Sequence, residues 1–365
     1  MKEKIFLGIL IIILSAVSLS AEGPEDEKDE EEQSSIYFLF HPIGFIDCMA
    51  EFEYTGIPLL EGTETVFGLN LTGGWVSRNY FLDISDAYIL PGTSGFNSED
   101  AEFKKIYLDW QLGIRQGFFW NERIGENLLE GFIYYNGCYE YNINDPQRPQ
   151  QYFFNYSGSA EADGQFQTSV EFGGAYNDVS INDHSVKEGI EALLQLDCGP
   201  DFLNRSADYY HLNTEIKVYI PIIDIEPERG FNLFNIYLAE RFKLGYANGD
   251  YVPVNVRYDN RADIRGVERE RFNTKFTVTN NLELRINFPA LFLPALMPGF
   301  LVYFDSAFYF EEAGYQGFLI STGAGLYLDI FGFFQVGVRL DYLINDFKMD
   351  GKKLTFPGLM FQFQF

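Results

Sequence analysis

Few side chains in this sequence have the types and spacing that covalent or metal chemistry needs. Cys48, Cys138 and Cys198 are too few and too far apart for a metal cluster, although one pair could form a disulfide in an oxidising compartment. The three histidines show no paired-ligand spacing. Residues 182–184 (Asn-Asp-His) could belong to a hydrolase dyad, but no Gly-x-Ser-x-Gly element accompanies them. We therefore expect no catalysis, no cofactor and no bound metal.

The sequence does carry a repeated alternation of apolar and polar residues, with a period of two. It is clearest after Lys275, where the apolar positions are Phe276, Val278, Leu282, Leu284, Ile286 and Phe288. It recurs in the ranges 106–115, 166–173, 215–220, 234–243, 334–342 and 359–365. Successive side chains of a strand point to opposite faces, so each stretch has one apolar and one polar face. Apolar-out, polar-in strands predict an all-β fold, a transmembrane antiparallel β-barrel of outer-membrane type with about fourteen strands.

The composition is consistent with this fold class. Aromatic residues make up 18% of the chain, with 37 Phe and 24 Tyr, which suits a lipid-facing surface with interfacial belts. The 34 glycines suit tight turns and crowded inward positions. A formal net charge of −27 argues against a nucleic-acid partner, which would require a basic surface.

The N-terminus reads as a secretion signal followed by an acidic segment. Lys2 and Lys4 precede an apolar run from residue 5 to residue 17, and small residues follow near an expected cleavage site after Ser20 or Ala21. We expect residues 1–21 to be a signal peptide, which directs the chain to the bacterial outer membrane. Residues 22–35 are acidic and polar and predict a disordered periplasmic tail. The barrel then occupies residues 36–365.

A more specific pattern lies in the last quarter to third of the chain. Five motifs occur in a fixed order: Asp-Ile-Arg-Gly (263–266), Asn-Leu-Glu-Leu-Arg (281–285), Tyr-Phe-Asp-Ser-Ala (303–307), Gly-Ala-Gly-Leu (323–326) and Arg-Leu-Asp-Tyr (339–342). This order resembles the C-terminal barrel region of the BamA/TamA-type outer-membrane assembly factors, also called bacterial surface antigens. The resemblance implies a barrel of sixteen strands.

The resemblance also implies a site inside the barrel. In that family an Arg-Gly loop folds into the lumen, and its arginine meets carboxylates on inward-facing strand positions. Carried over by position, Arg265 and Gly266 form the loop, with Glu283 and Asp305 as partners of the arginine. The alternative is a solvated loop arginine above acids that merely line a polar interior. The further inward polar positions are Arg285, Arg339 and Asp341.

The family also suggests a function. Its first and last strands meet at a weak seam, where substrate strands are thought to be templated or lipid perturbed. Its members carry periplasmic POTRA domains before the barrel, and only residues 22–35 stand there in this sequence, so we expect a member without POTRA domains. The expected role is membrane biogenesis, by protein insertion or translocation. The expected partners are outer-membrane lipid and unfolded outer-membrane or secreted proteins.

Two other functions remain open at the level of sequence. A passive or gated diffusion pore would use inward charges to tune ion preference, and the candidates are Glu171, Glu215, Lys217, Arg241 and Lys243. A surface-exposed structural or adhesive protein would instead use its long outer loops. The polar runs 91–103, 143–163 and 247–270 predict such loops, whereas the apolar segment 288–299 predicts a periplasmic turn.

Overall fold

The computed structural model describes the chain in segments. These are residues 35–42, 48–55, 59–79, 98–148, 151, 153–154, 163–181, 187–204, 207–225, 234–253, 256, 258–259, 263–267, 273–290, 296–310, 316–330, 334–345, 354–356 and 359–363. The expected signal peptide (1–21) and all but the last residue of the acidic segment (22–35) lie outside these segments. Within them, helix α2 (Ser98–Ala101) has a single turn, and no helix is long and apolar enough to cross a membrane.

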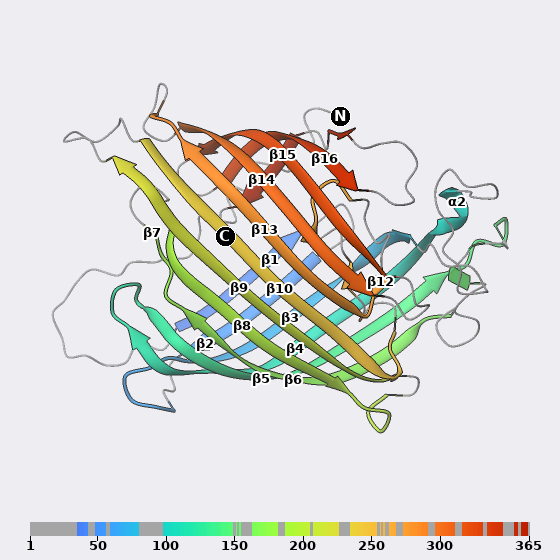
Figure 1. Cartoon of the computed structure of the whole chain (residues 1–365). Helices are drawn as coiled ribbons and strands as arrows, with labels where there is room; N and C mark the ends of the chain where they lie inside the picture. Colours follow the sequence, from blue (N-terminus) through green and yellow to red (C-terminus); the bar gives the residue numbers. More distant parts are fainter. Residues whose placement is uncertain are drawn as a thin grey trace, which may run out of the picture.

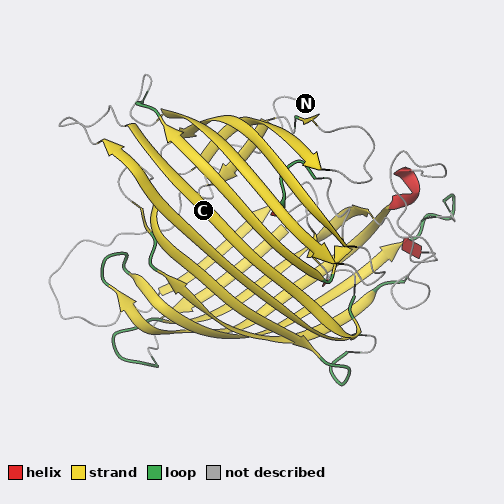
Figure 2. Ribbon diagram, viewed as in Figure 1, coloured by secondary structure: helices red, strands yellow, loops and turns green. Residues whose placement is uncertain are grey.

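One antiparallel sheet dominates the molecule and curves into a barrel of strongly tilted strands (Figures 1 and 2). Its strands are β1 (Ser35–Pro42), β2 (Cys48–Thr55), β3 (Thr65–Asn79), β4 (Glu102–Asn121), β5 (Glu126–Ile143), β6 (Gln165–Asn177), β7 (Ser180–Ile181), β8 (Lys187–Gly199), β9 (Asp208–Ile225), β10 (Phe234–Tyr251), β13 (Phe276–Asn287), β14 (Leu296–Phe310), β15 (Gln316–Ile330), β16 (Phe334–Asn345), β17 (Leu354–Thr355) and β18 (Leu359–Phe363). A separate ribbon joins β11 (Tyr258–Asp259) to β12 (Asn273–Thr274).

The sheet order follows the chain. Each strand pairs with its neighbours in sequence, with two-residue β7 attached only to β8, and both β17 and β18 paired with β16. With β17 and β18 counted as one interrupted strand, the described part of the chain forms fourteen wall positions. This confirms the predicted fold class and the strand number read from the alternation, whereas the described segments do not form the sixteen wall positions that the resemblance implies.

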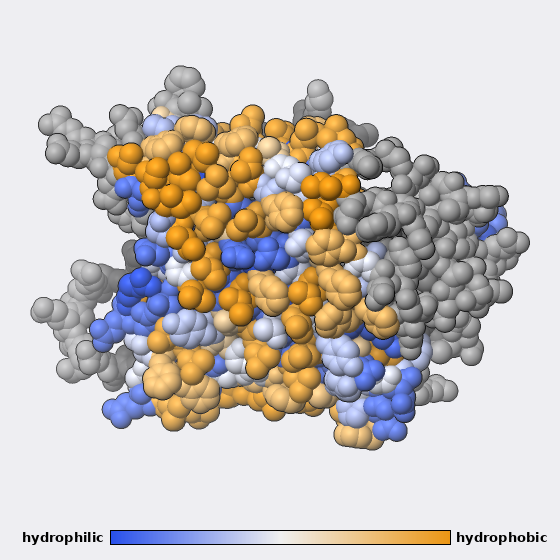
Figure 3. Space-filling model, in the orientation of Figure 1, coloured by the Kyte–Doolittle hydropathy of each residue, from blue (hydrophilic) through white to orange (hydrophobic). Residues whose placement is uncertain are grey.

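The barrel wall exposes its apolar face and buries its polar face, which is the reverse of a soluble protein. On β4, Ile106, Leu108 and Leu112 are exposed on the outside, while Lys105 on the inside is buried. On β13, Thr277 and Thr279 face inward and are fully buried. Apolar residues accordingly cover much of the outer face in Figure 3, with hydrophilic residues between them. The period-two pattern of the sequence therefore sorts side chains between lipid and lumen.

Three predicted boundaries were wrong. The run 247–270 was expected to be loop, but β10 continues to Tyr251 because its pairing with β9 extends to Asp208. The run 91–103 was expected to be loop through residue 103, but β4 begins at Glu102. The apolar turn 288–299 is shorter than expected, because β14 begins at Leu296 and includes Pro298. That proline can join the ladder because its carbonyl accepts a hydrogen bond from the Phe288 amide at 2.9 Å.

Several inward tyrosines lie directly across the ladder from a glycine. Tyr303 pairs with Gly323, and a Cβ added to that glycine would lie 2.6 Å from the tyrosine ring and 2.2 Å from the Leu340 carbonyl oxygen. The same arrangement joins Gly199 to Tyr209, Gly299 to Tyr327 and Gly317 to Tyr309. The missing side chain makes room for the neighbouring ring, which covers the exposed glycine backbone. These glycines fit the crowded inward positions expected from the composition.

In the described part of the wall, a hydrogen-bonded polar pair lies on the lipid-facing side. Asn280 on β13 donates to the Glu240 carboxylate on β10 at 2.8 Å. Both residues lie in outward register, with Leu238 and Phe242 on either side of Glu240 along β10. A carboxylate facing lipid is costly, and the amide hydrogen bond reduces that cost.

The close Tyr303–Gly323 approach generates a stability prediction. We expect Gly323→Ala to reduce the free energy of unfolding by about 1–3 kcal/mol, because the added methyl group overpacks a site closed by backbone and by a ring. Urea unfolding of the protein in detergent micelles measures this. Gly68→Ala is the matched control, since nothing lies within 4 Å of a Cβ built there. An equal effect at both positions would contradict the packing explanation.

Candidate functional site

Part of the connection between β10 and β13 lies inside the barrel. Ile264 and Val267 pack in an apolar cluster with four residues of β14, β15 and β16: Ala307, Tyr309, Leu319 and Leu343. Ile264 is completely buried. Earlier in the same connection, Val252 and Val256 pack with Ala207, Tyr209 and Ala247. We call the described residues of this connection, 252–253, 256, 258–259 and 263–267, the lumen loop. Its apolar side chains fix it to the inner wall at two places.

Arg265 stands at the centre of the lumen loop's polar contacts. Its Nε donates to Asp305 Oδ2 at 2.8 Å and its Nη2 to Asp305 Oδ1 at 2.5 Å, so the guanidinium grips both carboxylate oxygens. The backbone amide of Arg265 also donates to Asp305 Oδ2, at 3.1 Å. Its Nη1 donates to Glu283. The structure therefore brings together the three charged residues that the family resemblance associates.

A second layer of contacts surrounds this ion pair. The Arg265 guanidinium lies 3.7 Å from the centre of the Tyr303 ring, a cation–π geometry. The Tyr303 hydroxyl donates to Asp341 at 2.5 Å, and Arg339 donates to both oxygens of the same carboxylate, at 2.5 and 3.0 Å. Gly266 has a φ of +84°, and a Cβ there would meet the Asp341 side chain at 3.2 Å. Glycine thus allows both the left-handed turn and the close approach.

Asp263 forms a second ionic contact that the sequence analysis did not identify. Its carboxylate accepts from Arg241 and, at 3.1 Å, from Lys243, both on β10. Its backbone carbonyl accepts from Asn281 on β13 at 2.6 Å. The Asp263 side chain is only 2% exposed. Two features of the sequence could have indicated this contact. Asp263 stands two residues before Arg265, and the preceding strand carries two bases, Arg241 and Lys243, on its polar face.

Most of the other charged residues that were predicted to face inward are connected by ion pairs. Arg285 donates to Glu283 at 2.7 Å, so this carboxylate binds Arg265 and Arg285 together. The candidate pore residues divide into two groups: Glu215, Lys217, Arg241 and Lys243 belong to the network, whereas Glu171 lies farther away and accepts from Asn136 at 2.6 Å.

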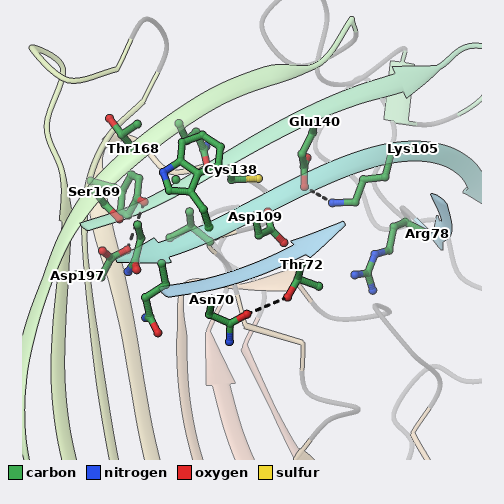
Figure 4. A pocket seen from close by; sticks show the side chains of 17 residues that line it. Asn70, Thr72, Arg78, Lys105, Asp109, Cys138, Glu140, Thr168, Ser169 and Asp197 are labelled. Atoms are coloured by element: carbon green, nitrogen blue, oxygen red, sulfur yellow. Dashed lines mark hydrogen bonds and ion pairs between the residues drawn. The ribbon is translucent and has the colours of Figure 1, made fainter. Parts of the chain in front are cut away.

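The lumen loop borders two cavities. One, of about 450 Å³, lies among β3–β6, β8 and β9 and includes Val256 of the loop in its lining (Figure 4). The other, of about 290 Å³, lies among β8–β10, β13 and β16, with Asp263 and Arg265 of the loop in its lining. The first is near the ends of the strands that carry long connections, and the second is nearer the short turns. We call them the outer and inner cavities.

The outer cavity has a mixed polar lining. Figure 4 shows the Lys105 ammonium directed at Glu140, with Asp109 and Cys138 nearby on β4 and β5. Asp197 of β8 accepts from the Tyr209 hydroxyl at 3.3 Å. Acceptors, donors and the Lys105–Glu140 ion pair suit water and polar solutes. They do not form an assembled catalytic constellation.

The chemistry-bearing residues first considered are dispersed. No disulfide joins Cys138 and Cys198, because Cys138 lies on the inner face of β5 and Cys198 on the outer face of β8. The side chain of Cys48 and residues 182–184 lie outside the described residues. Within the described ranges, no group of three or more His, Cys, Asp or Glu side chains could hold a metal ion.

At the turn between β6 and β7, an exposed pair offers a comparison for the buried charges. Asn121 and Arg123 donate to Asp178 at 2.8 and 2.7 Å, and these hydrogen bonds lower the pKa of that carboxyl group. The Arg123 and Asp178 side chains are 50% and 38% exposed, whereas that of Asp305 is fully buried. Solvent screens the first pair and not the second.

Comparison with known proteins supports the barrel architecture. No protein-family profile and no curated protein matches the sequence. Among solved structures, BamA from Haemophilus ducreyi lacking POTRA domains 1–3 superposes with a TM-score of 0.55 at 12% identity, covering 90% of this chain and 64% of that chain. This chain thus spans less than two thirds of that structure. At such low identity the likeness establishes the fold alone.

Two other barrels are more distant. A bacterial polysaccharide outer membrane secretin has a TM-score of 0.33 at 9% identity, covering 87% of each chain. The FrpB iron transporter from Neisseria meningitidis has a TM-score of 0.31 at 8% identity, covering 83% of this chain and 46% of its own. These scores are too low for any functional argument.

The buried Arg265 contact generates a second prediction. Arg265→Ala should lower the free energy of unfolding by about 3–5 kcal/mol, because it leaves the Asp305 and Glu283 charges inside the wall without their shared partner. Urea unfolding and heat-modified gel mobility in detergent measure the loss, and single-channel recording measures release of the lumen loop as a change in conductance. Arg123→Ala, which removes an exposed arginine, is the control and should change little. Mutant traces and mobility identical to those of the wild type would defeat the assignment.

Proposed function

We propose that this protein is an outer-membrane barrel that acts in membrane biogenesis by inserting or translocating other proteins. The observation that carries the proposal is the lumen loop with Arg265 bound to Asp305 and Glu283, in a barrel whose fold is like that of BamA. The proposed role is not enzymatic. It needs only a wall that is rigid in one part and can be opened in another.

The rigid part is the half of the wall that the lumen loop joins together. Asp263 ties the loop to β10, Arg265 ties it to β13 and β14, and Ile264 packs against β14, β15 and β16. Strands β10, β13, β14 and β15 also have a long ladder on both sides, and β16 has one with β15. Separating any two of them would break many backbone hydrogen bonds and the loop contacts together.

The part proposed to open is the seam between the first and last strands. β1 pairs with β2, and β17 and β18 pair with β16 through two and five residue pairs. Within the segments that the structure describes, no ladder joins β1 to β17 or β18. Unpaired backbone groups at a sheet edge are a template for an added strand. The proposed partners are therefore unfolded outer-membrane or secreted proteins, together with the surrounding lipid.

A locked seam tests the proposal. In a variant with Cys48, Cys138 and Cys198 replaced by serine, cysteine pairs scanned along β1 and β18 should, when oxidised, abolish the acceleration of barrel folding in liposomes. Reduction should restore it. The control disulfide joins Val278→Cys and Phe308→Cys, which are direct partners on β13 and β14 and outward-facing. Equal activity of the locked and unlocked seam, or of wild-type and empty liposomes, would refute the proposal.

A second candidate function is a diffusion pore, which the two polar cavities on either side of the lumen loop favour. In this case the loop is the constriction, and Arg241 and Lys243 hold it through Asp263. Asp263→Ala should then raise the single-channel conductance in planar bilayers, because it frees the loop from β10. Lys104→Gln, on the outer face of β4, should leave it unchanged. Wild-type membranes without steady conductance, and no gain in Asp263→Ala, would exclude a pore.

A further inference from the structure

One charged side chain lies in the middle of the lipid-facing wall. Glu240 stands six residues after the start of β10 and eleven before its end, in outward register with Val218 and Leu282. On the described wall strands β3–β16, the other outward-facing charged residues are among the first or last three of a strand, as Lys104 and Glu188 are. Figures 1 and 3 view the side of the barrel that β10, β13 and β14 form, and hydrophilic residues interrupt its apolar surface. A charge at this depth is costly and marks a candidate site.

The hydrogen bond from Asn280 uses only part of the bonding capacity of this polar pair. Asn280 Nδ2 donates one N–H to Glu240 Oε1 at 2.8 Å. Among the residues that the structure describes, no other hydrogen bond or ion pair reaches either side chain. A primary amide has two N–H donors and an acceptor oxygen. The second N–H and the Oδ1 of Asn280 are therefore available on a face where lipid chains offer no partner.

The surroundings of Asn280 leave room for another polar group to reach its amide. On β14, the residue directly opposite Asn280 is Ser306, whose side chain is small. Ser306 lies between Phe304 and Phe308, which are 43% and 42% exposed. On β10 the direct partner of Asn280 is Phe242, which is 38% exposed. The face therefore has a polar centre beside a small residue and aromatic rings around it, a composition that suits close contact between proteins in a membrane.

We propose that this face is the contact surface of a symmetric dimer of the protein in the membrane, with the Asn280 amides of the two copies hydrogen-bonded to each other. Each Asn280 keeps one N–H on the Glu240 of its own chain. It donates the other N–H to the Oδ1 of the second copy's Asn280 and accepts one bond in return. Every donor and acceptor of the two amides then has a protein partner.

A second copy is the occupant whose chemistry and depth both match. A twofold axis along the membrane normal brings the same residue of two chains together at the same depth in the bilayer. An amide both donates and accepts, so two identical amides are complementary to each other. Glu240 lies on the neighbouring strand, away from an axis that passes beside Asn280, so the two carboxylates do not have to meet. This inference goes beyond the proposed function and does not depend on it, because the contact involves β10, β13 and β14 rather than β1 and β18.

Sedimentation equilibrium of the full-length protein in density-matched detergent micelles tests the dimer. We expect a reversible monomer–dimer equilibrium in the wild type. Asn280→Leu should raise the dimer dissociation constant at least tenfold, because it removes both hydrogen bonds between the copies. Tyr135→Phe is the matched control, since it takes a hydroxyl group from the exposed face of β5, five places away in the sheet order, and should leave the dissociation constant unchanged. Heat-modified mobility verifies that each variant is folded.

Crosslinking in cell membranes locates the contact while leaving the polar pair intact. In a variant with Cys48, Cys138 and Cys198 replaced by serine, Leu282→Cys places a thiol on the outer face of β13, two residues from Asn280. A short bis-maleimide should join two copies through this position. Leu112→Cys, which is 54% exposed in the wild-type residue and lies on β4, six places away in the sheet order, should give no such product.

The outcomes separate the second copy from other occupants of this face. A wild type that sediments as a monomer at every concentration would overturn the proposal, as would a dimer that Asn280→Leu leaves equally tight. If Asn280→Leu does not fold, the Leu282→Cys crosslink decides, because that variant keeps both polar side chains. A crosslink from Leu282→Cys to a different protein would assign the face to that protein, and no crosslink would assign it to lipid. Either result refutes the dimer.

Discussion

The constraint on which this structure depends is that lipid offers no hydrogen-bond partner to a peptide group. Each N–H and C=O that faces the bilayer must therefore be paired within the wall, and the long antiparallel ladders do this from β2 to β16. A ladder of this kind sends alternate side chains outward and inward. The outward ones must be apolar, so nearly all the charged groups of the wall are forced into a narrow interior. In the interior these charged side chains lie close enough together to form ion pairs.

The charges around the lumen loop consequently form one network that includes Asp263 and Arg265 of the loop, while Glu171 and the Lys105–Glu140 pair lie apart from it. Two loop residues of opposite sign, Asp263 and Arg265, bind strands on either side of the loop's path. Ile264 between them fills an apolar gap, and Gly266 after them turns the chain against Asp341. Four consecutive residues thus combine ionic, apolar and backbone contacts with β10, β13, β14 and β16. These four residues hold the loop in place without filling the outer and inner cavities that it borders.

Much of the wall could be predicted from sequence because alternation is a local property. The strand from Phe276 to Asn287 and the inward position of Glu283 follow from the period-two pattern alone. The association of Arg265 with Glu283 and Asp305 came from the order of motifs, since no spacing rule joins residues 18 and 40 positions apart. Family resemblance supplied what periodicity could not.

The features that were missed depend on the path of the chain in three dimensions. The role of Asp263 requires knowing that the loop turns back across β10. The tyrosines that cover glycines require the register between neighbouring strands, which the side-chain pattern does not give. The extension of β10 to Tyr251 depends on a partner strand that also continues, because neither is apolar enough there to be recognised alone.

The sharing of one carboxylate by two bases has a consequence for how this interior can change over time. Where two bases share Asp263 or Glu283, loss of one base leaves the acid with another partner, whereas loss of the acid leaves two cations facing each other at once. Random substitution is therefore tolerated unevenly, and selection should remove acid losses more strictly than base losses. Over many generations these shared sites would keep their acids and lose bases, so their net charge would drift toward the negative.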